Sequence, residues 1–383
     1  MEQAELRRFV ADLVAIPSVN PLEGPAGEGK GEGPVAAFLQ AKLEEAGIEA
    51  ELQEVLPDRP NLVARLPGAS EEAIWFDAHL DTVTGQGMDS PFTPKVEGDR
   101  LVGRGAADDK ASLAAIVAAL IRVARSGERP PATVLFTGTM DEEHGMRGMR
   151  ALLEAGRQAR GAVVAEPTGL EIVVAHKGVA RFTVSTAGKS AHSSRPELGA
   201  NAIYRMARVV SALEHYARGG IGRDTHPFLG KATLSVGVIR GGEYVNVIPD
   251  YCEIEVDRRL LPDEDGRRAV GEVRTYLTSA IEEDLGIEVR APNLLVPGLN
   301  MSVDDPWVQA VGAEVKRVTG KLSAVGNVAT THAGLLYEAG MPVVVLGPGS
   351  MGQAHTATET LELPQVEQAA AIYELLMRSG ATP

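Results

Sequence analysis

Residues 73–83 read AIWFDAHLDTV, an apolar run that ends in a histidine and an aspartate. A short run of this kind, rich in aromatic and β-branched residues, is typical of a buried strand. Similar runs stand at residues 61–66 (NLVARL), 132–140 (ATVLFTGTM) and 161–166 (GAVVAE), and a helical pattern, KASLAAIVAALIRVARSG, fills residues 110–127. Strands that alternate with helices predict an α/β fold with a layered α/β/α domain.

The length of 383 residues exceeds what one hydrophobic core usually supports, so we expect two domains. The amphipathic N-terminus and a glycine-rich loop near residues 23–33 lead into the first domain. After His176 the pattern changes to strands and helices of a smaller α+β unit, and buried-strand signals return near residue 293. The sequence therefore predicts one domain from residues 1–176 and 293–383, with residues 177–292 inserted into it.

Composition excludes several classes of protein. No stretch is long and apolar enough to span a membrane, and the N-terminus does not have the pattern of a secretion signal, so we expect a cytoplasmic protein. The formal net charge of -15 argues against nucleic acid or an anionic membrane as a partner. Cys252 is the only cysteine, which excludes an intrachain disulfide and a cysteine-based zinc site, and we interpret it as a buried small apolar residue.

Polar residues follow the predicted strands, where open α/β sheets place their ligands. His79 and Asp81 lie two apart on an extended segment and so share one side. The carboxylate could orient a metal-binding imidazole, and a purely structural pair is the alternative.

Asp108 and Asp109 follow a glycine-rich turn and precede the helix at residues 110–127. Gly103 and Gly105 resemble the start of a dinucleotide-binding motif, but Asp108 stands where the third glycine belongs and would repel a pyrophosphate. Helix capping explains one aspartate but not both.

Three consecutive acids, Asp141, Glu142 and Glu143, follow the strand at residues 132–140. Glu166 ends another strand, and His355 stands on the glycine-rich loop after the apolar segment that begins at Met341. Each alone is more often a solvated residue. Together they form a mixed nitrogen and oxygen ligand set suited to zinc, cobalt or manganese. The positive charge of two divalent ions would be balanced by the negative charges of three carboxylates and one hydroxide.

These residues stand in motifs that resemble the family of acetylornithine deacetylase, succinyl-diaminopimelate desuccinylase, aminoacylases and glutamate carboxypeptidases, which use two co-catalytic metals. The resemblance covers nearly the whole chain and keeps the family's order. It runs through IPSVNP, AHLDTV, GRGAADDK, DEEHG, AEPT, HKG, GKSAHSSRPELGANAI, NVIPD, RRLLP and GPGSMGQAH.

The resemblance implies two divalent metal ions. Zinc is the expected metal, and cobalt or manganese is the alternative. His79 and Glu166 would hold one ion, Glu143 and His355 the other, and Asp108 would bridge them through a cis peptide to Asp109. Two further roles are implied: Asp81 would orient His79, and Glu142 would be the general base that moves a proton from water to the leaving nitrogen.

The resemblance further implies that residues 177–292 form a lid and dimerisation domain. In a homodimer His192 would stabilise the tetrahedral oxyanion in the partner's active site. Asn246 and Arg259 would bind substrate, with a surface salt bridge as the alternative for Arg259, and the backbone near Gly349 would add hydrogen-bond donors.

Three residues depart from the family pattern: His332 replaces an acid near the substrate pocket, Asp109 a methionine and Ala111 a glycine. They leave the acyl group and the side-chain preference open. We expect a hydrolase of N-acyl amino acids, deacetylase-like, with a carboxypeptidase or dipeptidase on the same scaffold as the alternative. A catalytically silent relative is disfavoured because the base and all ligands are present. A nicotinamide-dependent dehydrogenase is the remaining alternative.

Overall fold

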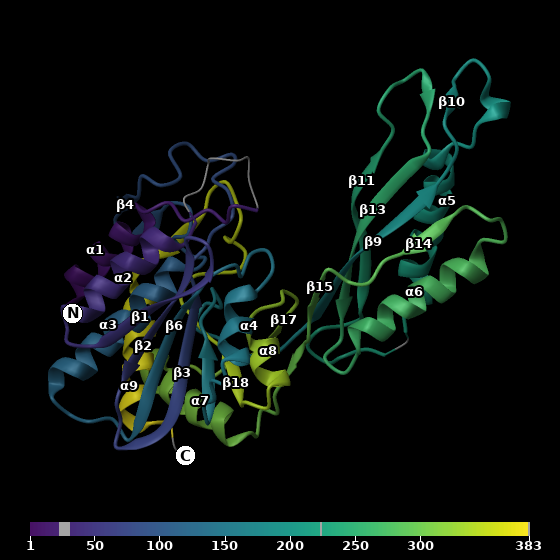
Figure 1. Cartoon of the computed structure of the whole chain (residues 1–383). Coiled ribbons are helices and arrows are strands. Elements are labelled where there is room, and N and C mark those ends of the chain that lie inside the picture. The colour runs from purple at the N-terminus through teal and green to yellow at the C-terminus, as the bar shows by residue number, and fades with distance from the viewer. Residues whose placement is uncertain (23–30, 223, 382–383) are drawn as a thin grey trace. The chain divides into compact units, whose positions relative to one another are not determined.

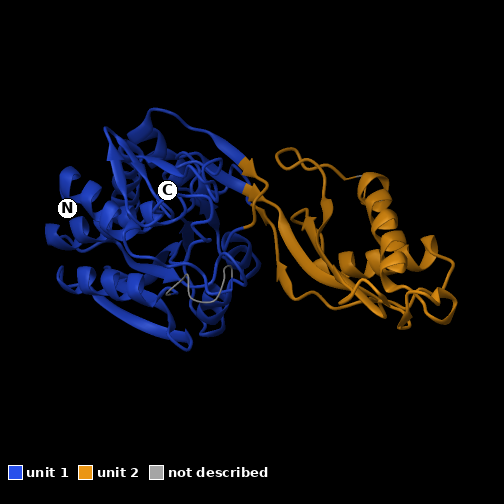
Figure 2. Cartoon of the chain, turned by 90° about the horizontal axis from the view of Figure 1, so that it is seen from above, with its two compact units in different colours: residues 1–174, 301–325, 331–383 blue, residues 175–300, 326–330 orange. Residues whose placement is uncertain are grey.

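The computed structural model describes residues 1–22, 31–222 and 224–381. It divides into two compact units (Figure 2). Unit 1 contains residues 1–174, 301–325 and 331–383, and unit 2 contains residues 175–300 and 326–330. Most of the expected glycine-rich loop, residues 23–30, lies outside the described residues.

Unit 1 is built on a mixed sheet whose central strands are parallel (Figure 1). In spatial order the strands are β1 (Glu49–Leu56), β2 (Arg59–Leu66), β6 (Ala132–Thr139), β3 (Ser70–His79), β7 (Gly161–Val164), β18 (Val343–Val345), β8 (Ile172–His176) and β16 (Leu299–Asn300), with β17 (Ala324–Asn327) paired to β8. Of these strands, β16 and the last two residues of β8 and of β17 belong to unit 2. Strand β3 runs parallel to β6 and to β7, and β7 runs parallel to β18. The carboxyl ends of these four strands therefore meet at one edge.

Helices cover both faces of this sheet, as alternate side chains of β3 show. Phe76 packs against Tyr373 with ring centroids 5.6 Å apart, whereas its neighbour Asp77 bonds His332 on the opposite face. The helices are α1 (Gln3–Val14), α2 (Gly33–Glu44), α3 (Lys110–Ser126), α4 (Arg147–Glu154), α7 (Pro306–Thr319), α8 (Ala333–Glu338) and α9 (Leu363–Ser379). Tyr373 belongs to α9 and His332 precedes α8. This arrangement confirms the predicted layered α/β fold.

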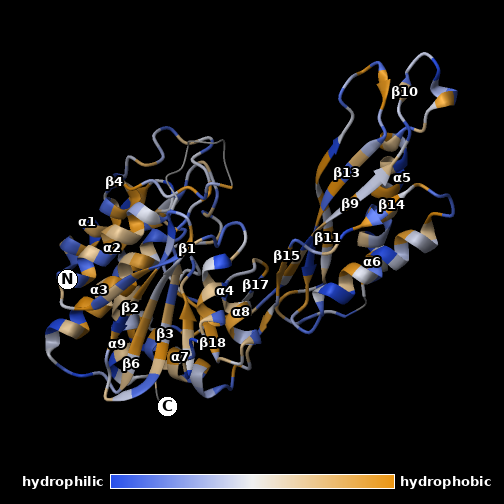
Figure 3. Ribbon diagram, viewed as in Figure 1, coloured by the Kyte–Doolittle hydropathy of each residue, from blue (hydrophilic) through white to orange (hydrophobic). Residues whose placement is uncertain are grey.

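Hydrophobic residues colour much of the central strands of unit 1 (Figure 3), and many of them are buried. The first part of α3, residues 110–121, is buried throughout because the helix packs between the sheet and α1 and α9. Short strands β4 (Lys95–Glu97), β5 (Arg100–Val102) and β19 (Thr360–Glu362) form a separate sheet at the edge of unit 1. Within the described part of the chain, no helix is long and apolar enough to cross a membrane.

Unit 2 is an antiparallel sheet with helices on one face. Its strands are β9 (Gly178–Ala187), β11 (Thr233–Gly241), β13 (Tyr251–Leu260), β14 (Ile287–Val289) and β15 (Leu294–Val296), and its helices are α5 (Ala202–His215) and α6 (Gly266–Ala280). Every second residue of β13 is buried, starting with Cys252, which lies in the core beneath the helices. A separate ribbon of β10 (Ala191–His192) and β12 (Val247–Ile248), a 3-10 turn (Pro196–Leu198) and a π-helical turn (Tyr216–Gly220) complete the unit.

The boundaries of the units differ in detail from the predicted residue 177–292 insertion. Unit 2 continues to Asn300, because β15 pairs with β9 and β16 pairs with residues 175–176, all of which belong to unit 2. It also includes residues 326–330. Gly326 packs so tightly against Phe228 that a Cβ at position 326 would lie only 2.4 Å from the Cβ of Phe228.

Candidate metal centre and its surroundings

The end of β3 places an imidazole beside a carboxylate. The Nδ1 of His79 donates to the carbonyl oxygen of Asp81 at 2.9 Å, so in the neutral ring the lone pair belongs to Nε2. That Nε2 lies 2.8 Å from Oδ1 of Asp108, which stands before α3. Both side chains are buried. The His79 nitrogen that could bind a metal ion, Nε2, therefore lies beside the Asp108 carboxylate.

Asp81 contacts His79 and also the acidic loop after β6. Its carbonyl is closer to His79 than its carboxylate, which lies 3.6 Å from Nδ1. The carboxylate instead accepts hydrogen bonds from the backbone N–H groups of Glu142 and Glu143, at 3.0 and 3.1 Å, and from Asn20 at 2.8 Å. Asp81 thus joins the end of β3 to the acidic loop after β6.

Two of the three consecutive acids of that loop, Asp141 and Glu143, point in different directions. Asp141 turns inward with φ 68° and is fully buried between Arg147, at 2.5 Å, and Arg59, at 3.2 Å. It is therefore neutralised within the fold. Glu143 points the other way, with Oε2 3.0 Å from Nε2 of His355.

His355 completes a compact cluster. Its Nε2 lies 3.3 Å from Oδ2 of Asp108, the carboxylate that also faces His79. Side-chain atoms of His79, Asp108 and Glu143 that could bind a metal ion all lie within 4.8 Å of one another. The peptide bond between Asp108 and Asp109 is cis. His355 is the most accessible member, with 54% of its side chain exposed, whereas the Asp108 side chain is 8% exposed.

The ionisation of the histidines reflects a concentration of negative charge. Hydrogen bonds to Asp108 and then Glu143 raise the pKa of His355 to about 11. Burial favours the neutral form of His79, but its contacts with Asp108 and Asp81 outweigh burial and raise its pKa well above the ordinary value. Such a field attracts cations, which compete with these protons for the same lone pairs.

Two further carboxylates lie beside this cluster: Glu166, which is buried, and Glu142, which is half-buried. Burial, followed by repulsion from Glu166, raises the pKa of Glu142 well above its ordinary value. Burial and the charge of Asp108 do the same for Glu166, which follows β7. Gly347 approaches so closely that a Cβ there would meet the carbonyl oxygen of Glu166 at 2.5 Å. Divalent cations would relieve this mutual repulsion, so the residues present fit a metal centre.

Gly349 lies on the same loop as His355. Its N–H donates to Oε1 of Gln365 at 2.8 Å, so a substrate would compete with Gln365 for that donor. Glycine is favoured here because φ is 90°, and because a Cβ would lie only 3.1 Å from the Cβ of Ala107.

The other predicted site residues belong to unit 2. His192 and Asn246 come together on the β10–β12 ribbon, where the N–H of Ser193 donates to the Asn246 carbonyl at 3.0 Å. His192 is exposed and its Nδ1 lies 2.7 Å from Oγ of Ser194. Arg259 lies on β13 and donates to Asp257 at 2.7 Å and to Thr330 at 3.2 Å, so a salt bridge is present within unit 2.

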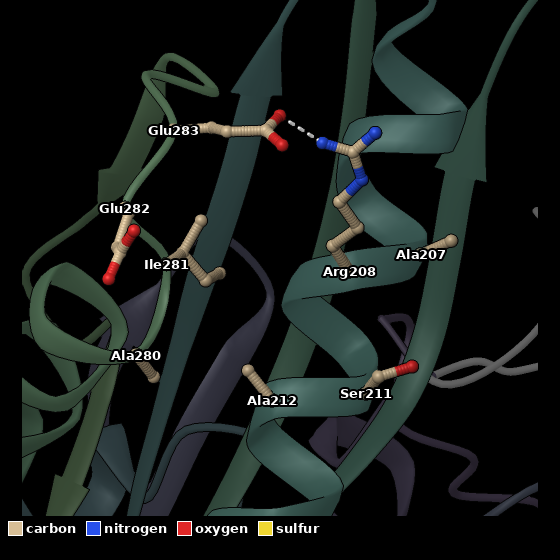
Figure 4. Close-up of a pocket in the computed structure, with 8 residues that line it drawn as sticks. All are labelled: Ala207, Arg208, Ser211, Ala212, Ala280, Ile281, Glu282 and Glu283. Carbon is tan, nitrogen blue, oxygen red and sulfur yellow. Dashed lines mark hydrogen bonds and ion pairs between the residues drawn. The ribbon is translucent and has the colours of Figure 1, made fainter.

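A surface groove on unit 2 has a different character (Figure 4). It measures about 630 Å³ and is lined by residues of α5 and by the end of α6 with the residues that follow, and Arg208 of α5 is paired to Glu283. The remaining lining residues are Ala207, Ser211, Ala212, Ala280, Ile281 and Glu282. Histidine is absent from this lining, and none of the predicted site residues belongs to it.

Sequence reasoning missed several residues that hold the cluster together. Asn20 bonds both Asp81 and Asp141, and Arg104 and Glu359 form a buried pair next to Asp108. Asn20 stands in the IPSVNP motif and Glu359 follows His355 by four residues, so proximity to quoted motifs was the available signal.

Comparison with known proteins identifies the family of the chain. The family described as Peptidase family M20/M25/M40 matches residues 75–379. An acetylornithine deacetylase from Myxococcus xanthus is 32% identical over 358 residues, covering 88% of this chain and 90% of that protein.

Solved structures agree at the level of the fold. An M20 family metallo-carboxypeptidase from Sulfolobus solfataricus superposes with a TM-score of 0.82 at 19% identity, covering 100% of both chains. A dinuclear metal binding peptidase of the M20 family from Bacillus subtilis gives a TM-score of 0.71 at 20% identity, covering 98% of this chain and 99% of that one. The family match over most of the chain and the 32% identity to the deacetylase show that the chain belongs to peptidase family M20/M25/M40 and is a hydrolase.

Proposed function

We propose that the protein is a dinuclear metallohydrolase that cleaves the amide bond of an N-acyl amino acid, as an acetylornithine deacetylase does. The observation that carries the proposal is the convergence of four side chains: Asp108 lies within hydrogen-bond distance of both His79 and His355, and Glu143 lies within hydrogen-bond distance of His355. The 32% identity to the Myxococcus xanthus acetylornithine deacetylase supports this branch of the family.

The ligand assignment is the one that the family resemblance implies, and the contacts of Asp108 support it. His79 and Glu166 would hold one ion, His355 and Glu143 the other, and Asp108 would serve both because its two oxygens face the two histidines. Imidazole and carboxylate ligands suit zinc, and cobalt or manganese would fit the same donors. The name of the Bacillus subtilis neighbour, a dinuclear metal binding peptidase, supports two ions.

The residues of the chain divide the reaction between them. When bound, the ions supply Lewis acidity to the amide carbonyl and to water. Glu142 takes a proton from the attacking water and delivers it to the leaving nitrogen. The Asp81 carboxylate fixes the backbone of Glu142 and Glu143, so the base and a ligand keep a constant spacing.

Substrate contacts would come from unit 2. Arg259 would clamp a substrate carboxylate if it exchanged its contact with Asp257 for the substrate, and Asn246 would donate or accept a hydrogen bond. His192 would stabilise the oxyanion of the tetrahedral intermediate in the site of a partner subunit. It is exposed, and its side chain contacts that of the neighbouring Ser194, so it is accessible for such a role.

A homodimer is part of this proposal. Strand β11 lies at the edge of the unit 2 sheet, and an open strand edge can pair with a second chain. Unit 2 also exposes large apolar side chains that a partner would cover. They include Leu198, Tyr204, Ile239, Tyr244 and Val245. The cytoplasmic location stays a prediction from the sequence.

The nearest alternative is a carboxypeptidase or dipeptidase. It is favoured by the name of the Sulfolobus solfataricus neighbour, a metallo-carboxypeptidase, whose likeness extends over the whole chain. The ligand set serves both reactions, because amide hydrolysis is the same chemistry. Only the substrate distinguishes them.

A substrate panel tests these proposals. The protein is stripped of metal with a chelator, reloaded with zinc, cobalt or manganese, and given N-acetyl, N-succinyl and N-carbamoyl amino acids and dipeptides. Metal-restored release of free amino acids from the N-acyl compounds supports the deacylase. Cleavage confined to dipeptides replaces it with the peptidase. A protein that binds two ions and cleaves nothing favours the catalytically silent relative.

A further inference from the structure

Arg104 and Glu359 form a buried ion pair beside the metal centre. Nη1 of Arg104 lies 2.7 Å from Oε2 of Glu359, and the two side chains are 2% and 0% exposed. Neither residue belongs to the proposed ligand or substrate-binding set. Because burial of two charges costs free energy that their attraction often fails to recover, stability alone is a weak explanation for such a pair.

The Glu359 carboxylate is a receptor for the backbone that carries Asp108. Its oxygens accept hydrogen bonds from the N–H groups of Gly105 at 3.0 Å, Ala107 at 2.9 Å and Asp108 at 3.1 Å. Gly105 has φ 81°, and a Cβ there would lie 2.9 Å from Cγ2 of Thr82. The turn is therefore shaped so that successive N–H groups converge on one carboxylate.

This arrangement also answers the dinucleotide alternative. The N–H donors of the Gly103–Asp108 turn that a pyrophosphate would need are taken by an internal carboxylate. A phosphate at this place would have to displace Glu359, which is fully buried.

Arg104 ties the same turn to two other segments. Its Nε donates to the carbonyl oxygen of Thr84 at 2.8 Å, three residues beyond Asp81, and its Nη2 donates to the carbonyl oxygen of Thr356 at 3.2 Å, next to His355. The pairing of β5 with β19 brings these segments together, with Leu101 opposite Leu361. One ion pair thus joins the segments that carry His79, Asp108 and His355.

We propose that Glu359 and Arg104 are positioning residues that hold Asp108 and His355 at the spacing the metal ions require. This inference rests on the proposed metallohydrolase function. Neither residue touches substrate or metal in this role. Both act through the backbone of the ligand segments, and outer residues of this kind change metal affinity about 10-fold to 100-fold when replaced.

The test is a titration of the metal-free protein with Co²⁺, in which the visible absorption of the bound ion is measured. The native chain and Glu359→Gln are compared. Gln retains the size of Glu but turns an NH2 group toward backbone donors. We expect cobalt affinity to fall by about 10-fold or more and the absorption bands to shift, because coordination geometry changes. Glu359→Asp, which keeps the charge on a shorter arm, should recover part of the affinity.

Trp307→Phe is the matched control. It removes a buried hydrogen bond of 2.9 Å from Trp307 to the carbonyl of Ala162 in the same unit, so it should lower the melting temperature without changing cobalt affinity or spectrum. If Glu359→Gln does not fold, Arg104→Lys replaces it. Lys keeps the charge but cannot serve Glu359, Thr84 and Thr356 together.

The outcomes separate this inference from the proposed function. Folded Glu359→Gln, or Arg104→Lys in its place, with native cobalt affinity and spectrum overturns the positioning role. A native protein that binds two cobalt ions but hydrolyses nothing overturns the proposed function and leaves the positioning test intact. A native protein that binds no cobalt overturns both.

Discussion

The Nδ1 of His332 donates a hydrogen bond of 2.8 Å to Oδ2 of Asp77, two residues before His79 on β3. Both side chains are buried. The other oxygen of Asp77 accepts from the Thr137 hydroxyl at 2.5 Å, and that hydroxyl accepts from the Trp75 indole at 2.8 Å. Within the described residues, Nε2 of His332 has no hydrogen-bond partner. A series of hydrogen-bonded polar side chains thus packs against β3, the strand that carries the proposed metal ligand His79.

Replacing His332 by Ala should destabilise the protein by about 3–5 kcal/mol, because Asp77 would lose its imidazole partner in a buried site. The midpoint of urea unfolding measures this loss. His332→Asn is the control, since its amide can still donate to Asp77 and should recover part of the stability. A loss below about 1 kcal/mol for His332→Ala would mean that water replaces the imidazole.

Replacing Glu142 by Ala should lower kcat by at least about 100-fold, since a general base contributes 100-fold to 10,000-fold. Metal content should stay near the native value, because Glu142 is outside the ligand set. Elemental analysis and steady-state kinetics on the same sample check both parts. If the variant turns over substrate at a near-native rate, another group is the base.

Replacing His355 by Ala should reduce the bound metal toward one ion per chain, because Glu143 would lose the imidazole that lies 3.0 Å from it. Elemental analysis after dialysis gives the stoichiometry. His215→Ala, at the exposed end of α5, is the control for losing a histidine. Unchanged stoichiometry would remove His355 from the ligand set.

Mixing an inactive Glu142→Ala variant with an inactive His192→Ala variant should restore up to about a quarter of the native activity, because a hybrid dimer would hold one complete site. Subunit exchange is verified with differently tagged chains. Exchange without rescue would show that His192 does not act on the partner's site.

Lowering the pH should weaken unit 2 through His176. Burial lowers the pKa of this imidazole from 6.5 to about 4, against the opposing effect of its hydrogen bond to the Lys177 carbonyl. Below pH 6.5 the unfolded chain takes up a proton that the folded chain refuses until about pH 4. The free energy of unfolding should therefore fall across this window, by up to about 3 kcal/mol.

Comparison of the native protein with His176→Gln isolates this effect from other titrating groups. The difference between their free energies of unfolding should be constant above about pH 7 and should shrink as the pH falls toward 4. A difference that does not change with pH would contradict the burial of a neutral imidazole.

The sequence predicts the layered fold and the approximate places of its strands because a buried parallel sheet imposes continuous apolar runs. His79 and Glu166 could be placed at one edge for the same reason, since parallel strands end together. Spacing does not reveal side-chain direction in a loop. Asp141 and Glu143 are two apart, yet the positive φ of Asp141 turns its carboxylate inward to Arg147 and Arg59.

Long-range pairing explains what else could not be predicted. The contact between Arg104 and Glu359 joins positions 255 residues apart and depends on the pairing of β5 with β19. Residues 326–330 pack with unit 2, but a segment this short has no periodicity that assigns it to either unit. Such contacts arise from topology, which local patterns do not encode.

Cys252 is the only thiol of the chain, and burial both hides it and raises its pKa. Maleimide dyes should therefore ignore it in the folded protein and react only with cysteines introduced on the surface. Glu71 of unit 1 and Arg268 of unit 2 have exposed side chains suited to such replacement. A donor and an acceptor dye at these positions would follow the distance between the units by energy transfer as metal and substrate bind, with the native cysteine left in place.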